Sequence, residues 1–274
     1  MKKILIANRG EIALRIIKAC RKAGIKSVAI FSEADRHSRH VWMADEAVCI
    51  GPANSTQSYL DIERILFVAK ATGADAIHPG YGFLAENSRF ARACAEAGLI
   101  FVGPSADMID LMGDKIMARQ AASRAGVRVV PGTETGFSLA DLAQAKAMVH
   151  QIGFPLLLKA AAGGGGRGMR VVRSIAEFED EFRQATREAE AAFGDGTIYL
   201  ERYFDKARHI EVQVLSDRHG RHIHLGERDC TIQRRHQKLI EESPSPAITA
   251  AERKEVCDMA VALTRTLQYE NAGT

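Results

Sequence analysis

The sequence has few of the features that mark secreted, membrane-spanning or nucleic-acid-binding proteins. Its five cysteines are odd in number and include no CxxC pair, which argues against a disulfide framework or a zinc site. Aromatic residues make up 6% of the chain and the formal net charge is only +3. We therefore expect neither a base-stacking surface nor a strong electrostatic field for nucleic acid.

Long apolar runs are also lacking. No stretch approaches the roughly 20 residues of a membrane span. The first apolar run ends after a few residues at Asn-Arg-Gly-Glu (8–11), which is too short for a signal peptide. These absences predict a cytoplasmic protein with no membrane partner, although a transit peptide removed ahead of residue 1 would leave no mark on this sequence.

What remains is the composition of an ordinary globular protein, with 46% hydrophobic and 26% charged residues. A chain of 274 residues can form one large domain or two ordinary ones. Four cysteines have apolar or helical neighbours and are predicted to lie in the core: Cys20, Cys49, Cys94 and Cys257.

The first 110 residues alternate short apolar runs with amphipathic helical patterns. The expected strands are 3–8, 26–32, 46–51, 74–80 and 99–105, and the expected helices include 10–23, 61–72 and 88–97. This β-α-β alternation predicts a parallel, doubly wound sheet, in which ligands gather at the carboxyl ends of the strands. The segments 8–11, 78–87 and 102–105 fall at those ends. A dinucleotide turn is disfavoured there, because the first turn has one glycine where GxGxxG is needed.

From residue 114 onward the pattern is typical of an α+β unit. We expect helices at 114–125, from about 139 and at 175–192, and strands at 154–161, 168–174 and 197–204. Residues 207–229 alternate polar and apolar side chains, which predicts two antiparallel strands joined by a turn at 217–220. The last helix is predicted to begin at Thr249, which can form a capping box with Glu252.

Four consecutive glycines, Gly163 to Gly166, lie between two apolar strands. A flexible linker would carry polar residues on both sides, and a Walker A loop would continue into Gly-Lys-Ser/Thr and a helix. Glycine lets backbone amides approach a ligand closely, and the cations of Lys159 and Arg167 suit a polyphosphate. On spacing alone, a hairpin tip with incidental charges remains an alternative.

Two long motifs carry a family resemblance. HPGYGFLAEN (78–87) and ERDCTIQRRHQK (227–238), together with ILIANRGEIALRII, LMGDK, KAAAGGGGRGMR and RHIEVQVL, resemble the biotin carboxylase family in order along the whole chain. Members are the ATP-grasp subunits or domains of biotin-dependent carboxylases. Carbamoyl-phosphate synthetase shares the ATP-grasp fold, but we expect it to match these two motifs less well.

The resemblance implies an α/β fold in two parts. A pre-ATP-grasp, Rossmann-like domain is expected at 1–113, and an incomplete ATP-grasp domain at 114–274 with a glycine-rich lid at about 131–203. The implied reaction phosphorylates bicarbonate with ATP and Mg²⁺ (or Mn²⁺) to carboxyphosphate, and then carboxylates biotin. Biotin would arrive on a biotin carboxyl carrier protein or domain. A carboxyltransferase is the other implied partner, and the full-length protein is expected to be a homodimer.

The resemblance also assigns residues. Lys115 and Lys159 would contact the ATP phosphates, the amides of Gly165 and Gly166 would cover the triphosphate, and Lys238 would hold bicarbonate or carboxyphosphate. Around the nucleotide it places Glu201, Arg202, Tyr203 and Phe204, which would contact adenine largely through Glu201 and backbone groups, and also His209, Gln233 and His236. Taken singly, these lysines and histidines would be ordinary surface residues. Cys230 is expected to serve packing, because this chemistry needs no thiol.

The chain departs from the family pattern at its end. The metal-binding glutamates, an asparagine, the catalytic arginine and the biotin-site arginine of the family are expected beyond residue 274, so no metal ligand is predicted here. Four acidic residues in the basic segment are expected to form ion pairs instead: Glu227, Asp229, Glu241 and Glu242. The resemblance therefore predicts a fragment that is inactive alone and has an open strand edge.

Two other functions stay open from the sequence. One is a different ATP-grasp carboxylate ligase, and the other is a truncated, non-catalytic ATP-binding module. The final acceptor of the parent enzyme is also open among acetyl-CoA, propionyl-CoA, methylcrotonyl-CoA, pyruvate and urea.

Overall fold

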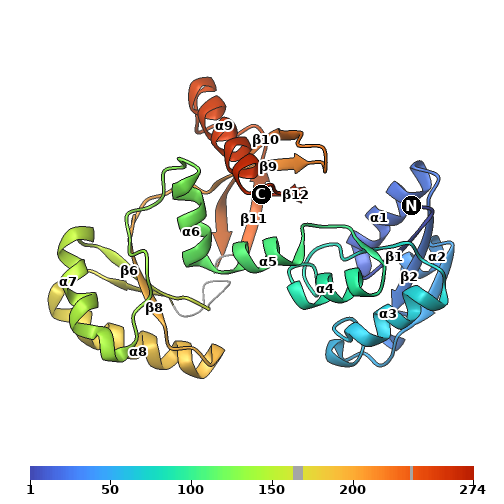
Figure 1. Cartoon of the computed structure of the whole chain (residues 1–274), viewed down its shortest axis with the longest axis horizontal. Coiled ribbons are helices and arrows are strands. Elements are labelled where there is room, and N and C mark those ends of the chain that lie inside the picture. Colours follow the sequence, from blue (N-terminus) through green and yellow to red (C-terminus); the bar gives the residue numbers. More distant parts are fainter. Residues whose placement is uncertain (163–168, 235–236) are drawn as a thin grey trace. The chain divides into compact units, whose positions relative to one another are not determined.

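The computed structural model describes residues 1–162, 169–234 and 237–274 (Figure 1). The chain divides into two compact units, Met1–Asp110 and Leu111–Thr274. Among the described residues, the first unit has two apolar clusters and the second unit has one. In the part of the chain that the structure describes, no helix combines the length and the apolar character needed to cross a membrane.

The N-terminal unit is built on a five-stranded parallel sheet with the order β3-β2-β1-β4-β5. Its strands are β1 (Lys3–Ile6), β2 (Lys26–Phe31), β3 (Glu46–Cys49), β4 (Ala76–His78) and β5 (Ile100–Phe101). Its helices are α1 (Gly10–Lys22), α2 (Arg39–Met43), α3 (Ile62–Ala71), α4 (Ser88–Glu96) and α5 (Ala106–Gly113), which runs into the next unit, with 3-10 turns at Glu33–Asp35 and Ser55–Gln57.

Apolar side chains on both faces of β1 explain why helices cover both faces of this sheet. Leu5 and Ala7 pack in one cluster with residues of α3 and α4, whereas Ile4 and Ile6 pack in another with residues of α1. Successive side chains of a strand point to opposite faces, so an unbroken apolar strand requires helices on both sides. The predicted parallel, doubly wound sheet is confirmed.

One of the cysteine predictions is wrong. Cys20, Cys94 and Cys257 are buried, but Cys49 is exposed. It ends β3, which is an edge strand of the sheet and has no fully buried residue. Burial in the interior raises the pKa of the Cys94 thiol to about 12.

The turn after β1 is held by buried and partly buried polar contacts. Arg9 donates to Asp35 at 2.6 Å, and Asp35 also accepts from the Tyr59 hydroxyl at 2.7 Å. The Arg9 hydrogen bond is the main reason why the pKa of Asp35 lies well below its usual range, and it outweighs the opposing effect of burial. Asn8 donates to the carbonyls of Pro79 and Tyr81 at 2.8 and 2.7 Å. The segments 8–11 and 78–87 therefore meet where β1 and β4 end, as the parallel sheet predicts.

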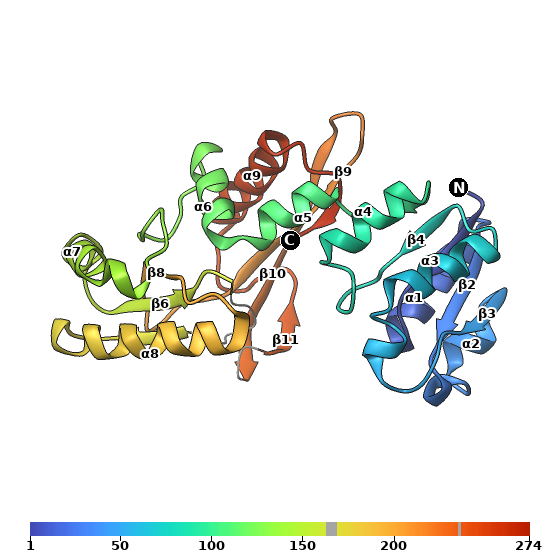
Figure 2. The same cartoon turned by 60° about the horizontal axis from the view of Figure 1, so that its bottom comes forward.

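The described part of the second unit contains two antiparallel sheets. The first has the order β7-β6-β8, formed by β6 (Leu156–Ala160), β7 (Met169–Val172) and β8 (Ile198–Arg202). The helices α7 (Leu142–Ile152) and α8 (Ile175–Phe193) pack on it, and the connection from α6 (Lys115–Arg124) includes a 3-10 turn at Leu139–Asp141 (Figure 2). Leu158, Phe178 and Phe182 are fully buried in the shared core.

The other sheet has the order β11-β10-β9-β12 and carries the helix α9 (Ala250–Thr266). Its strands are β9 (Ile210–Ser216), β10 (His222–Arg234), β11 (Gln237–Glu242) and β12 (Asn271–Gly273). The predicted capping box of α9 is confirmed, because the Thr249 side chain accepts from the Glu252 amide and Glu252 accepts from the Thr249 amide. The two-part α/β architecture that the sequence predicted is present.

Candidate functional site

The first cluster consists of Lys115, Arg119, Lys159 and Glu201. A carboxylate shared by two cations forms its centre. Glu201, on β8, accepts from Lys159 Nζ at 2.5 Å through Oε2 and from Arg119 Nη1 at 2.8 Å through Oε1. Only 9% of its side chain is exposed. Lys159 lies directly across from Tyr199 in the β6–β8 pairing, and its ammonium is 5.9 Å from the centroid of that ring. Lys159, Tyr199 and Glu201 therefore share one face of the sheet.

The helix α6 brings two of the cations to this face. Asp114 caps α6 by accepting from the amides of Ile116 and Met117, and it thereby fixes the helix start just before Lys115. Arg119 follows Lys115 by four residues and lies on the same side of the helix. Burial and, secondarily, the nearby Lys159 charge lower the pKa of Lys115, against a smaller opposing effect of Glu201.

The four named side chains of this cluster carry more positive than negative charge. Lys115, Arg119 and Lys159 bring three positive charges, and Glu201 brings one negative charge. Cations gathered in a partly buried place attract an anion that carries several negative charges, since the low local dielectric strengthens each contact. The first cluster can therefore bind a polyphosphate.

The segment after Glu201 is fixed by the chain around it. The Arg202 side chain donates to the carbonyl of Ile152 at 3.0 Å, and its amide donates to the carbonyl of Pro131 at 2.7 Å. The Tyr203 amide donates to the carbonyl of Pro155 at 2.9 Å, and Phe204 is 53% exposed. The predicted adenine contacts of Arg202, Tyr203 and Phe204 stay predictions.

The second cluster lies on β9, β10 and β11. Glu211 accepts from Arg228 Nε at 2.7 Å and also from Lys238 Nζ. The hydrogen bond to Glu211 raises the pKa of Lys238. Burial opposes ionisation of Glu211, but the bonds from Lys238 and Arg228 outweigh it and lower its pKa. Lys238 is therefore protonated at neutral pH and can hold a small anion.

Two further predicted residues lie beside this ion network. The Gln233 side chain is 2.8 Å from His209 Nδ1 and donates to the Cys230 carbonyl, also at 2.8 Å. The ring Nε2 of His209 is 3.8 Å from Glu211. Cys230 is fully buried and its pKa is raised, mainly by burial and then by the Glu211 charge, which makes it a packing residue as predicted.

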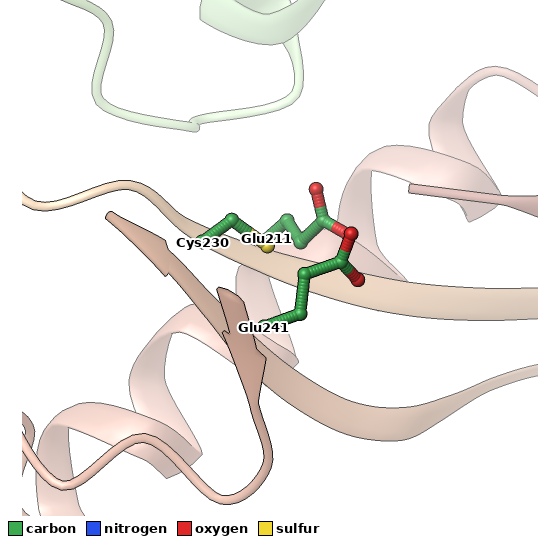
Figure 3. Close-up of side chains that lie close together, drawn as sticks. All are labelled: Glu211, Cys230 and Glu241. Atoms are coloured by element: carbon green, nitrogen blue, oxygen red, sulfur yellow. The ribbon is translucent and has the colours of Figure 1, made fainter. Parts of the chain in front are cut away.

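Ligand atoms of Glu211, Cys230 and Glu241 lie within 4.8 Å of one another, and the two carboxylates face each other (Figure 3). This group does not fit a resident metal ion. Arg228 pairs with both carboxylates and Lys238 pairs with Glu211, so the negative charge is already compensated by side chains. We assign no metal to it.

The structure brings together most of the predicted residues that it describes. Lys115, Lys159 and Glu201 form the first cluster, and His209, Gln233 and Lys238 belong to the second. Gly165, Gly166 and His236 lie outside the described residues.

Sequence reasoning missed three members of these clusters: Arg119, Glu211 and Arg228. A signal existed for two of them. Arg119 shares a helix face with Lys115, and Glu211 shares a strand face with His209.

The acidic residues of the basic segment form the expected ion pairs in three cases. Glu227 pairs with Arg253 at 2.6 Å, Asp229 with Arg208 at 3.8 Å and Glu241 with Arg228 at 3.7 Å. The prediction is confirmed for these carboxylates.

Comparison with known proteins identifies the class. Residues 114–274 match the family described as carbamoyl-phosphate synthase L chain, ATP binding domain, and residues 1–109 match the biotin carboxylase N-terminal domain. The chain thus joins an ATP-grasp-type nucleotide-binding domain to an N-terminal parallel-sheet domain. With relatives about half identical over its whole length, it belongs to the biotin carboxylase family.

Three relatives illustrate the match. Biotin carboxylase 1 of Bacillus subtilis is 53% identical over 274 residues, which are 100% of this chain and 60% of that protein. The Campylobacter jejuni biotin carboxylase, solved as a β-γ-ATP complex, is 49% identical with a TM-score of 0.93, over 99% of this chain and 60% of that one.

The third is the biotin carboxylase domain dimer of Hydrogenobacter thermophilus 2-oxoglutarate carboxylase, solved with MgADP, ADP and bicarbonate. It is 50% identical with a TM-score of 0.91, over 99% of this chain and 59% of that one. The chain therefore spans about 60% of the length of these relatives.

Proposed function

We propose that this chain provides the ATP-binding and bicarbonate-binding part of a biotin carboxylase. The observation that carries the proposal is the excess of positive side chains in the first cluster, where Lys159 and Arg119 pair with Glu201 and Lys115 is near enough for the Lys159 charge to lower its pKa. The related structures solved with a β-γ-ATP complex, MgADP and bicarbonate support this choice of ligands.

In this proposal Lys115 and Lys159 neutralise the phosphates of ATP. Phosphoryl transfer depends mainly on positioning and on compensation of charge, which these residues can supply without covalent chemistry. Glu201 and the backbone of Arg202, Tyr203 and Phe204 would contact adenine, and the amides of Gly165 and Gly166 would cover the phosphates.

The second cluster would hold bicarbonate. Lys238 is the proposed catalytic residue, because its ammonium is kept protonated by Glu211 and can pair with bicarbonate or carboxyphosphate. His209, Gln233 and His236 would line the nucleotide beside it. Mg²⁺ would arrive with the nucleotide, where it neutralises phosphate charge.

Biotin on a carrier protein or domain is the proposed acceptor of the carboxyl group. A carboxyltransferase and a second copy of the chain are the proposed partners, and the cytoplasm is the proposed location.

Calorimetric titration of this chain with MgATP tests the proposal. We expect saturable binding in the micromolar to millimolar range that is common for enzyme substrates, roughly 1 μM to 1 mM. Binding should weaken when Mg²⁺ is removed, because phosphate charge is then less compensated. Bicarbonate added to the ATP-bound chain should give a second binding signal that Lys238→Met abolishes. No MgATP binding at millimolar concentration would contradict the proposal.

A non-catalytic nucleotide-binding module predicts a different pattern. Its affinity for ATP would be unchanged without Mg²⁺, and bicarbonate would give no signal. The titration therefore separates the two functions in one series of measurements.

A further inference from the structure

Arg119, on α6, connects this helix to β8 and to the chain segment at Val130. Its Nη1 donates to Glu201 Oε1 at 2.8 Å, and its Nη2 donates to the carbonyl of Val130 at 2.7 Å. The side chain is 17% exposed. Lys159 occupies the other carboxylate oxygen of Glu201, so the two cations do not compete for one acceptor atom.

Glu201 needs a permanent partner if Lys159 is to bind phosphate. Its side chain is only 9% exposed, and a buried carboxylate that loses its counter-charge is strongly destabilised. With Lys159 as the sole partner, movement of that lysine toward a phosphate would leave Glu201 uncompensated. Part of the free energy gained from the phosphate contact would then be lost in breaking the ion pair between Lys159 and Glu201.

The geometry of Arg119 removes this conflict. A guanidinium presents several donors in a rigid plane and stays charged at any working pH. The bond to the Val130 carbonyl fixes this plane against the chain, so Arg119 can keep Glu201 paired while Lys159 moves. A lysine at this position has a single ammonium on a flexible stem and cannot match both contacts in the same way.

We propose that Arg119 is a positioning residue of the nucleotide site, which keeps Glu201 charge-compensated so that Lys159 can turn from Glu201 to the ATP phosphates. This role rests on the proposed ATP-binding function. Arg119 itself is not expected to touch the nucleotide. It acts through Glu201, and this dependence distinguishes it from a residue that merely ties α6 to β8.

A double-mutant cycle measures that dependence. MgATP affinity is determined by calorimetry for the unsubstituted chain, Arg119→Met, Glu201→Gln and the double variant. We expect Arg119→Met to weaken binding about tenfold, the size of one charge-assisted contact. In the Glu201→Gln background the same substitution should change affinity by less than about twofold, because no buried charge remains to be compensated.

Two further variants complete the test, a matched control and a charge-conserving substitution. Arg124→Met, on the same helix and exposed, is the matched control and should bind as the unsubstituted chain does. Arg119→Lys keeps the charge beside Glu201 and should give an intermediate affinity for MgATP. It replaces Arg119→Met in the test if Arg119→Met does not fold. Circular dichroism and thermal melting verify folding of each variant.

The outcomes separate this role from the function on which it rests. No MgATP binding by the unsubstituted chain would overturn the proposed function, and this role with it. Binding by the unsubstituted chain with equal binding by Arg119→Met, or equal losses with and without Glu201, would overturn the positioning role alone.

Discussion

Replacing Lys159 by methionine is expected to weaken MgATP binding to this chain by roughly 10- to 100-fold. Hydrogen bonds to charged groups contribute about 1.5 to 3 kcal/mol, and each 1.4 kcal/mol is a factor of ten in affinity. Methionine keeps most of the length and apolar character of the lysine stem and removes only the charge. Glu201 stays paired with Arg119 in this variant, so the fold should be retained. Calorimetry with MgATP measures the effect.

Lys146→Met is the matched control for this substitution. Lys146 lies on α7 in the same unit, is 46% exposed and is 3.8 Å from Glu179, which makes it a surface ion pair of small value. The two variants have the same net charge. If both bound MgATP equally well, long-range charge and not a specific contact would account for binding, and Lys159 would lose its assigned role.

The largest expected effect on stability comes from Arg253→Met. Glu227 is 2% exposed and accepts from Arg253 Nε at 2.6 Å and from the Ser245 amide at 3.0 Å. Removing the guanidinium leaves a buried carboxylate without its cation, which costs roughly 3 kcal/mol in the free energy of unfolding. The contact holds α9 on the sheet that carries Lys238, so this loss should be seen in the second unit.

Urea unfolding followed by circular dichroism measures this loss. Adding Glu227→Gln to Arg253→Met should recover most of the stability, since a neutral amide no longer needs a cation. Lys254→Met is the control, because its ion pair with Asp258 is exposed to solvent and contributes little to stability. The fluorescence of Trp42, the only tryptophan, reports on unfolding of the N-terminal unit. The urea transition followed by this fluorescence should be unaffected by Arg253→Met. Equal destabilisation by Arg253→Met and Lys254→Met would contradict the assignment.

Local sequence patterns predicted the parts of the fold that depend on neighbouring residues. The unbroken apolar run of β1 required a sheet covered on both faces, and the Thr249–Glu252 spacing placed the start of α9. Cys49 was misplaced because its exposure depends on β3 being an edge strand, and strand order is a property of the whole sheet.

The site could be predicted only through motif resemblance, and the contacts inside it could not. Lys159 and Glu201 are 42 residues apart in sequence, and Arg119 and Glu201 are 82 apart. Nothing local to Arg119 indicates that its partner is a buried carboxylate on a distant strand. The motif resemblance predicted a contact between Glu201 and adenine. It did not predict the pairing of Glu201 with Lys159 and Arg119, because both partners are distant in sequence.

Lysine modification with and without MgATP tests the central claim most directly. The chain is treated briefly with acetic anhydride, and the acetylation of each lysine is measured by mass spectrometry. We predict that saturating MgATP protects Lys115 and Lys159 from acetylation and leaves exposed Lys146 unchanged. Unaltered modification of Lys115 and Lys159 under conditions where MgATP is bound would contradict the claim that these residues form the nucleotide site.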